Sequence, residues 1–266
     1  MENKLIFEYT KEIAQETKQR AILRSIQERE SNLSDLSDQQ KGLLNEIKVN
    51  PENNILGDKY SLILEMAAQL KKMWRPSRVL KVYFFQGDNI KSRVLEYASI
   101  WSEYCSIRFV ETMDRNESDI RVSFENTGSW SYIGVDALRV SKSEATMNFG
   151  WLNDLTPERE FKRVVLHEFG HALGLIHEHQ SPAVNINWNR DYIYNSLYFT
   201  LKWDKNTVDK NFFQEYEKAT TQYSQVDPLS IMAYSFPANF TYDGTSFPLN
   251  YELSDIDKEY IGKVYP

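Results

Sequence analysis

All four histidines of the 266-residue chain lie between positions 167 and 179, in the stretch HEFGHALGLIHEH. Residues four positions apart share one face of an α-helix, so His167 and His171 project two imidazoles from consecutive turns. Gly174 can adopt the left-handed conformation that ends a helix, and the chain can then return to present His177 as a third nitrogen ligand. Three neutral imidazoles leave a fourth position for water on a zinc ion, which is typical of a catalytic site.

The glutamate after the first of these histidines completes the predicted site. Glu168 is placed to take a proton from a zinc-bound water. A short H-E-x-x-H pattern also arises by chance on amphipathic helices, but the longer pattern found here fixes five positions. The flanking residues are apolar, as a buried active-site helix requires: Val164, Val165, Leu166, Phe169, Ala172 and Leu173. We therefore predict Zn2+ as the cofactor, with His167, His171 and His177 as its ligands and Glu168 as the general base.

The remaining histidine and the single cysteine receive no catalytic role. His179 lies two residues beyond the third ligand, and three ligands with a water already complete a catalytic zinc site. We expect it to be a rim or structural residue. Cys105 is the only cysteine, so no intramolecular disulfide can form and stability must come from the core and the metal.

Composition narrows the possible partners. The formal net charge of −7 provides no basic stripe that could neutralise phosphates, so we expect no nucleic-acid partner. No apolar run approaches the roughly twenty residues that span a bilayer. The first eight residues become charged at once and contain no secretory hydrophobic region. We expect a chain without membrane span or Sec signal, cytoplasmic as synthesised or exported by a signal-less route.

The chain divides near residue 73 into two parts. Residues 1 to about 50 are rich in Glu, Gln, Lys and Ser, and Ser37 with Gln40 resembles a capping box that opens a short helix. A polar, turn-rich break at 51–58 precedes a second helical pattern over 60–73. We expect residues 1–72 to form a small helical appendage, either a docking segment or a pro-segment-like one, ahead of a catalytic domain over 73–266.

In the second part the periodicity alternates between strand and helix. Strands are predicted over 79–85, 107–110 and 120–124, with an amphipathic helix over 90–101 between the first two. Thr156 as N-cap and Pro157 at the first helical position would start the metal-binding helix. Ser254 and Asp257 form a capping box for a closing helix. This order indicates an α+β fold.

A second motif lies about fifty residues beyond the histidines. Ser-Ile-Met-Ala-Tyr at 230–234, after the extended histidine motif, resembles the methionine turn of metzincin peptidases in the form found in the astacin group. Other astacin-like stretches are residues 105–109, residues 128–134 and the His177-Glu178 pair. The resemblance spans roughly residues 74–266.

This resemblance implies a zinc endopeptidase of the zincin class that acts on proteins or peptides. The fold would be a twisted mixed sheet with a backing helix and an active-site helix above the cleft, and an irregular lower subdomain with a C-terminal helix. Met232 would form a hydrophobic floor under the zinc. Tyr234 would be a metal ligand in the resting enzyme and would then donate a hydrogen bond to the tetrahedral intermediate.

The chain also departs from the family pattern. The disulfides of secreted astacins cannot exist here, Ala233 replaces a histidine common in the methionine turn, and His179-Gln180-Ser181-Pro182 replaces a stretch rich in arginine and aspartate. These differences indicate a divergent, microbial astacin-like enzyme. Metzincin substrates pair with an upper edge strand, for which residues 130–133 and 145–149 are candidates, although either could be a plain sheet strand.

Several alternatives stay open on the sequence alone. The protein could be a zinc-stabilised, non-catalytic binding module, although the presence of Glu168 favours the enzyme. It could also be a protease effector delivered to another cell, with residues 1–72 as its address. Leu56-Gly57-Asp58 resembles part of the aspartate switch of astacin pro-segments, yet a linker turn explains it as well. We expect the full-length chain to be catalytically active without removal of residues 1–72. Substrate preference and oligomeric state stay open.

Overall fold

The structure is a computed structural model that describes residues 8–11, 28, 41, 72–181, 185–214 and 227–266. The helices predicted from the capping box at Ser37 and from the pattern over 60–73 lie outside the described residues, apart from Lys41 in the first and residues 72–73 in the second. Asp58 of the candidate switch also lies outside them. The predicted catalytic part is therefore described almost completely.

A six-stranded mixed sheet forms the centre of the fold, with the strand order β1-β5-β6-β4-β2-β3. Its strands are β1 (Glu8–Lys11), β2 (Val79–Phe84), β3 (Arg108–Glu111), β4 (Ile120–Ser123), β5 (Ser129–Tyr132) and β6 (Met147–Asn148). The pair β5 and β6 is antiparallel and all other pairs are parallel. The mixed sheet and three of its strands were predicted. β1 was not, because its partner β5 lies more than a hundred residues away in the chain.

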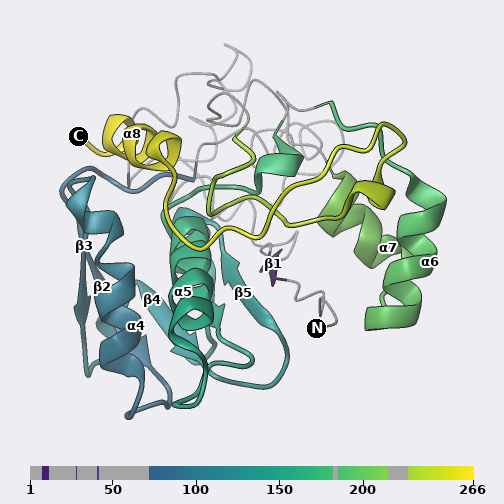
Figure 1. Ribbon diagram of the computed structural model, residues 1–266. Helices are drawn as coiled ribbons and strands as arrows, with labels where there is room; N and C mark the ends of the chain where they lie inside the picture. Colours follow the sequence, from purple (N-terminus) through teal and green to yellow (C-terminus); the bar gives the residue numbers. More distant parts are fainter. Residues whose placement is uncertain (1–7, 12–27, 29–40, 42–71, 182–184, 215–226) are drawn as a thin grey trace.

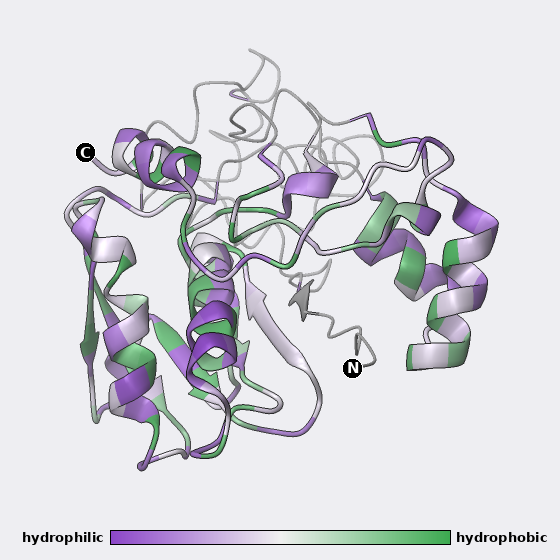
Figure 2. Ribbon diagram, viewed as in Figure 1, coloured by the Kyte–Doolittle hydropathy of each residue, from purple (hydrophilic) through white to green (hydrophobic). Residues whose placement is uncertain are grey.

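Helices α4 (Lys91–Ala98) and α5 (Glu158–Ala172) lie side by side against this sheet (Figure 1). The strand β2 is largely hydrophobic, whereas β3, β4, α4 and α5 each contain both hydrophobic and hydrophilic residues (Figure 2). The apolar sides meet in one core that contains Val82, Val94 and Phe169, each with no exposed surface. Burial of these side chains supplies the main driving force for this half of the fold.

The helix that carries the histidines begins one residue later than predicted. Glu158 is its first residue, and Pro157 occupies the N-cap position without a side-chain hydrogen bond. The hydroxyl of Thr156 instead accepts a hydrogen bond from the N–H of Asn153 and donates to the carbonyl of Trp151. The prediction of Thr156 as N-cap was therefore wrong, because its hydroxyl is used by the preceding turn.

The second half of the chain contains more helix than its turn-rich sequence indicated. It holds α6 (Arg190–Leu201), α7 (Lys205–Val208) and the π-helical turn η7 (Asp209–Phe213), which pack around a second hydrophobic core with Phe236, Phe240 and Phe247. The last helix, α8 (Asp255–Val264), begins with the predicted Ser254–Asp257 capping box. None of the helices in the described part of the chain combines the length and apolar character of a membrane span.

Candidate metal centre and active site

The end of α5 determines where the third histidine lies. Gly174 has φ +99°, the left-handed conformation predicted for it, and its N–H donates to the carbonyl of His171 at 2.8 Å. The N–H of Leu175 donates to the carbonyl of Gly170 at 3.0 Å. These two bonds form the Schellman motif that ends helices at a glycine. The chain turns back there, and the following extended segment carries His177 toward α5.

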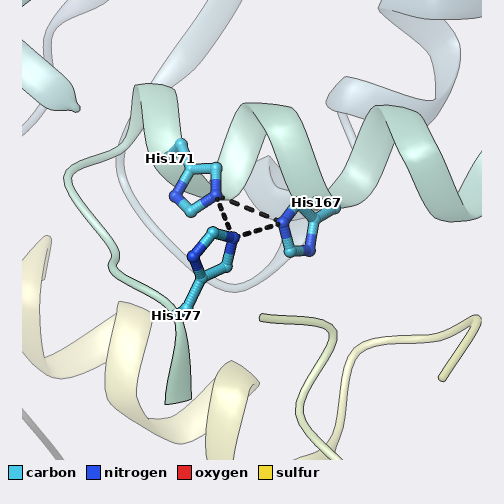
Figure 3. Close-up of side chains that lie close together, drawn as sticks. All are labelled: His167, His171 and His177. Carbon is cyan, nitrogen blue, oxygen red and sulfur yellow. Dashed lines mark hydrogen bonds between the residues drawn. The ribbon is translucent and has the colours of Figure 1, made fainter. Parts of the chain in front are cut away.

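Three imidazole nitrogens converge at this turn. The Nε2 atoms of His167, His171 and His177 lie 3.1–3.2 Å from one another, two from the helix and one from the returning chain (Figure 3). Zinc in a tetrahedral site with bonds of about 2.0–2.1 Å separates its nitrogen ligands by about 3.3–3.4 Å. The three nitrogens therefore fit a single metal ion, and the described residues contain this one histidine cluster of metal-binding size.

The opposite ring nitrogen of each histidine has a hydrogen-bond acceptor. Nδ1 of His167 lies 2.8 Å from the carbonyl oxygen of Ile231, and Nδ1 of His171 lies 2.9 Å from that of Leu175. Nδ1 of His177 lies 3.1 Å from Oε1 of Gln180. Because each acceptor requires the proton on Nδ1, the three Nε2 lone pairs all face the centre of the cluster. This is the tautomer that metal ligation needs.

Burial keeps the rings of His167 and His177 neutral. The pKa of His167 falls to about 3, mainly because burial penalises the imidazolium and to a smaller extent because of the positive charge of Arg163. The pKa of His177 also lies well below its usual value because of burial and the neighbouring histidines. Neutral imidazoles are the form that binds metal, so the cluster is ready for a cation at neutral pH.

The methionine turn packs directly beneath α5. Met232 is 2% exposed, and a Cβ atom added to Gly170 would lie 2.3 Å from its sulfur, so only glycine leaves room for this contact. The carbonyl of Met232 accepts a hydrogen bond from the N–H of Glu178, next to the third histidine. Met232 thus forms an apolar floor under α5, the arrangement that the resemblance implied.

Tyr234, two residues further on, stands beside the histidine cluster. Its ring centroid lies 4.1 Å from that of His177 and 4.7 Å from that of His179, and its side chain is buried. Met232 belongs to the first core and Tyr234 to the second. The methionine turn therefore crosses between the two halves of the fold next to the three predicted ligands.

Two other residues singled out from the sequence, Glu168 and His179, lie near this centre. Glu168 is fully buried on α5, one position after the first predicted ligand. His179 is 2% exposed rather than on a rim, and its Nε2 lies 2.9 Å from the carbonyl oxygen of Asn211. It does not belong to the group of residues that could share a metal ion with His177. This agrees with the expectation that His179 is a structural residue.

Neither of the candidate edge segments lies at an edge of the sheet that the structure describes. β6 lies between β5 and β4, so residues 145–149 are an interior part of the sheet. β5 would be the edge strand, but β1 pairs with it in parallel, with Tyr9 opposite Trp130 and Lys11 opposite Tyr132. The Nζ atom of Lys11 lies 3.4 Å from the centre of the Trp130 ring. The N-terminal part of the chain thus occupies the candidate substrate edge.

Two polar residues near the centre were not singled out from the sequence. Gln180 holds His177, and Asp257 accepts hydrogen bonds from the hydroxyl of Ser230 at 2.7 Å and from the N–H of Ile231 at 2.8 Å. Asp257 was recognised only as part of a helix cap. Neither residue belongs to a sequence motif for this site, and their roles follow from how distant segments pack.

A mixed sheet with a helix that carries two of three converging histidines, above a methionine turn, defines the metzincin class of zinc peptidases. Comparisons with known proteins narrow this class. The family model of the astacin peptidases matches residues 66–263, so the chain belongs to the astacin family. It is a metalloendopeptidase of a zinc-dependent family, and its substrates are proteins or peptides.

Solved structures of myroilysin are similar to the chain. One is 42% identical and is aligned over 73% of this chain and 96% of that chain, with a TM-score of 0.71. A crystal structure of myroilysin is also 42% identical. The alignment covers 73% of this chain and 86% of that chain, with a TM-score of 0.57. A comparison with curated protein sequences found no match.

Proposed function

We propose that the chain hydrolyses internal peptide bonds with a zinc ion held by His167, His171 and His177. The observation that carries this proposal is the convergence of the three Nε2 atoms to within 3.2 Å of one another, with every Nδ1 paired to an acceptor. Zinc bound there would lower the pKa of a coordinated water toward about 7 and would polarise a substrate carbonyl.

The side chains around the metal would carry the proton transfers. Glu168 takes a proton from the attacking water and passes it to the leaving amine, so it ends the cycle ionised as it began. The hydroxyl of Tyr234 donates a hydrogen bond to the oxyanion that develops on the scissile carbonyl oxygen. The proximity of the Tyr234 ring to the His177 ring supports this role, since it brings the phenol to the metal side of the second core.

The proposal is tested with purified protein, a casein-like substrate and a zinc chelator. We expect about one zinc per chain, cleavage of the substrate, loss of cleavage on chelation and recovery when zinc is returned. A chain that begins at Lys72, binds zinc and still cleaves no substrate would instead be the zinc-stabilised, non-catalytic binding module considered from the sequence. A chain that cleaves equally well after complete zinc removal would contradict the metal site.

We propose that the N-terminal segment acts like a pro-segment and not as a docking segment. Peptide substrates of this class pair with the edge of the sheet, and β1 occupies the edge of β5. A substrate strand and β1 cannot pair with the same edge at once. Residues 1–72 would therefore lower activity by covering the substrate edge, independently of any switch at Asp58. This proposal differs from our expectation, from the sequence, that the full-length chain is already catalytically active.

A further inference from the structure

Gln180 links the third predicted metal ligand to a distant turn of the chain. Its Oε1 atom lies 3.1 Å from Nδ1 of His177, and its Nε2 atom donates to the carbonyl oxygen of Lys210 at 2.9 Å. The side chain is 2% exposed. Both ends of the amide are therefore used, one toward the ligand and one toward the π-helical turn η7.

His177 differs in this respect from the other two histidines. Nδ1 of His167 and Nδ1 of His171 face backbone carbonyls, whose positions are set by the main chain. Nδ1 of His177 faces a flexible side chain instead. A glutamine loses considerable rotamer freedom when it is held in one position, so its amide needs the second bond to Lys210 to stay in place. The orientation of the third imidazole thus depends on residues 209–213.

The neighbouring residue binds the same turn. Nε2 of His179 lies 2.9 Å from the carbonyl oxygen of Asn211, so two consecutive side chains bind two consecutive carbonyls of η7. The carbonyls in the last turn of a helix lack partners within the helix, and these side chains supply them. π-helical turns are rare and occur frequently at functional sites. The short helix η6 (Glu178–Gln180) is thereby fixed against η7.

We propose that Gln180 is a positioning residue for the metal. It fixes the proton of His177 on Nδ1 and keeps the Nε2 lone pair directed at the centre of the cluster, and it makes zinc affinity depend on the η7 turn. The inference rests on the proposed zinc site. A hydrogen-bond partner of a zinc-bound histidine sets both its tautomer and its basicity, and its loss weakens metal binding by about 10- to 100-fold.

The test measures the zinc dissociation constant of the full-length chain by competition with a chromogenic chelator. Gln180→Met keeps an unbranched side chain of similar length but loses both polar ends, and we expect about 10- to 100-fold weaker zinc binding. Gln180→Glu keeps an oxygen acceptor for the His177 proton in either protonation state. It loses the amide donor to the Lys210 carbonyl, so we expect its zinc affinity to lie between those of Gln180→Met and the parent.

His179→Phe is the matched control, because it breaks the parallel bond to Asn211 and keeps an aromatic ring against Tyr234. We expect it to bind zinc nearly as tightly as the parent. Equal affinity in Gln180→Met and the parent would overturn the inference, as would an equal loss in Gln180→Met and His179→Phe, which would indicate a general loosening of η6. A parent chain that binds no zinc would contradict the proposed metal site itself.

Discussion

The carboxylate of Asp257 accepts a hydrogen bond from the backbone N–H of Ile231 at 2.8 Å, which joins the last helix to the methionine turn. The carbonyl of the same residue, Ile231, faces Nδ1 of His167 at 2.8 Å. One peptide segment thus connects the N-terminus of α8 with the first predicted metal ligand. The capping box of α8 therefore serves the site as well as the helix, since the Asp257 carboxylate also accepts from Ser230.

Removing this carboxylate should destabilise the protein and the site together. Asp257→Ala leaves the buried donors of Ser230, Ile231 and the N-cap without their partner, and we expect the free energy of unfolding to fall by about 2–4 kcal/mol. Denaturant unfolding measures the change. Asp255→Ala in the same helical turn is the control, because Asp255 is fully exposed. Equal losses in the two variants would contradict the role given to Asp257.

The role of Tyr234 is tested by removing one oxygen atom. Tyr234→Phe keeps the ring that packs on His177 and His179, so the fold and zinc content should survive. If the hydroxyl donates to the oxyanion, kcat falls by roughly 10- to 1000-fold while KM changes much less. Steady-state kinetics on a fluorogenic peptide separates the two constants. Unchanged kcat would assign Tyr234 to packing alone.

The raised pKa of Glu178 predicts that the stability of the protein depends on pH. This pKa is raised to about 8, mainly by burial and to a smaller extent by the negative charges of Asp257 and Asp227. The folded chain keeps this proton at pH values where the unfolded chain has lost it, so the contribution of Glu178 to stability is present below about pH 4 and is lost as the pH rises through about 8. The stability of the parent should therefore fall across this range on account of Glu178.

Glu178→Gln removes this titration, so its advantage in melting temperature over the parent should grow from pH 5 to pH 9. Thermal unfolding with zinc in excess measures the difference at each pH. Glu259→Gln, at an exposed position on α8, is the control. A constant difference between Glu178→Gln and the parent across the pH range would show that Glu178 keeps an ordinary pKa.

The proposed role of the N-terminal segment predicts that its removal activates the enzyme. A chain that begins at Lys72 lacks β1, so β5 becomes an open edge and kcat/KM on a peptide substrate should rise. Asp58→Ala in the full-length chain separates the two routes to latency, since edge covering predicts no activation by this change. Equal rates for the full-length and shortened chains would instead support a docking or stabilising segment.

The sequence predicted those parts of the structure that depend on local spacing. The histidine cluster, the turn at Gly174 and the cap at Ser254 are each specified within about a dozen residues, and helix geometry converts their spacing into position. Contacts between distant segments could not be predicted in this way. The pairing of β1 with β5 and the bond from Gln180 to Lys210 depend on how the whole chain packs.

Helix α6 escaped prediction for a different reason. Its sequence RDYIYNSLYFTL places aromatic and aliphatic residues around most of its circumference, so no single apolar face marks the helical period. Only Ile193 and Leu197, four residues apart, are buried along it. Its position against the second core became evident only in the folded structure.

The most direct test of the account compares zinc-loaded Glu168→Gln with the parent. Glutamine cannot accept the proton of the attacking water, while the three histidine ligands are untouched. Zinc content should stay at the parental level and peptide hydrolysis should fall by about 100- to 10,000-fold. The rates are measured on the full-length chain and on the chain that begins at Lys72. A zinc-loaded Glu168→Gln variant that hydrolyses peptides at the parental rate would contradict the proposed mechanism.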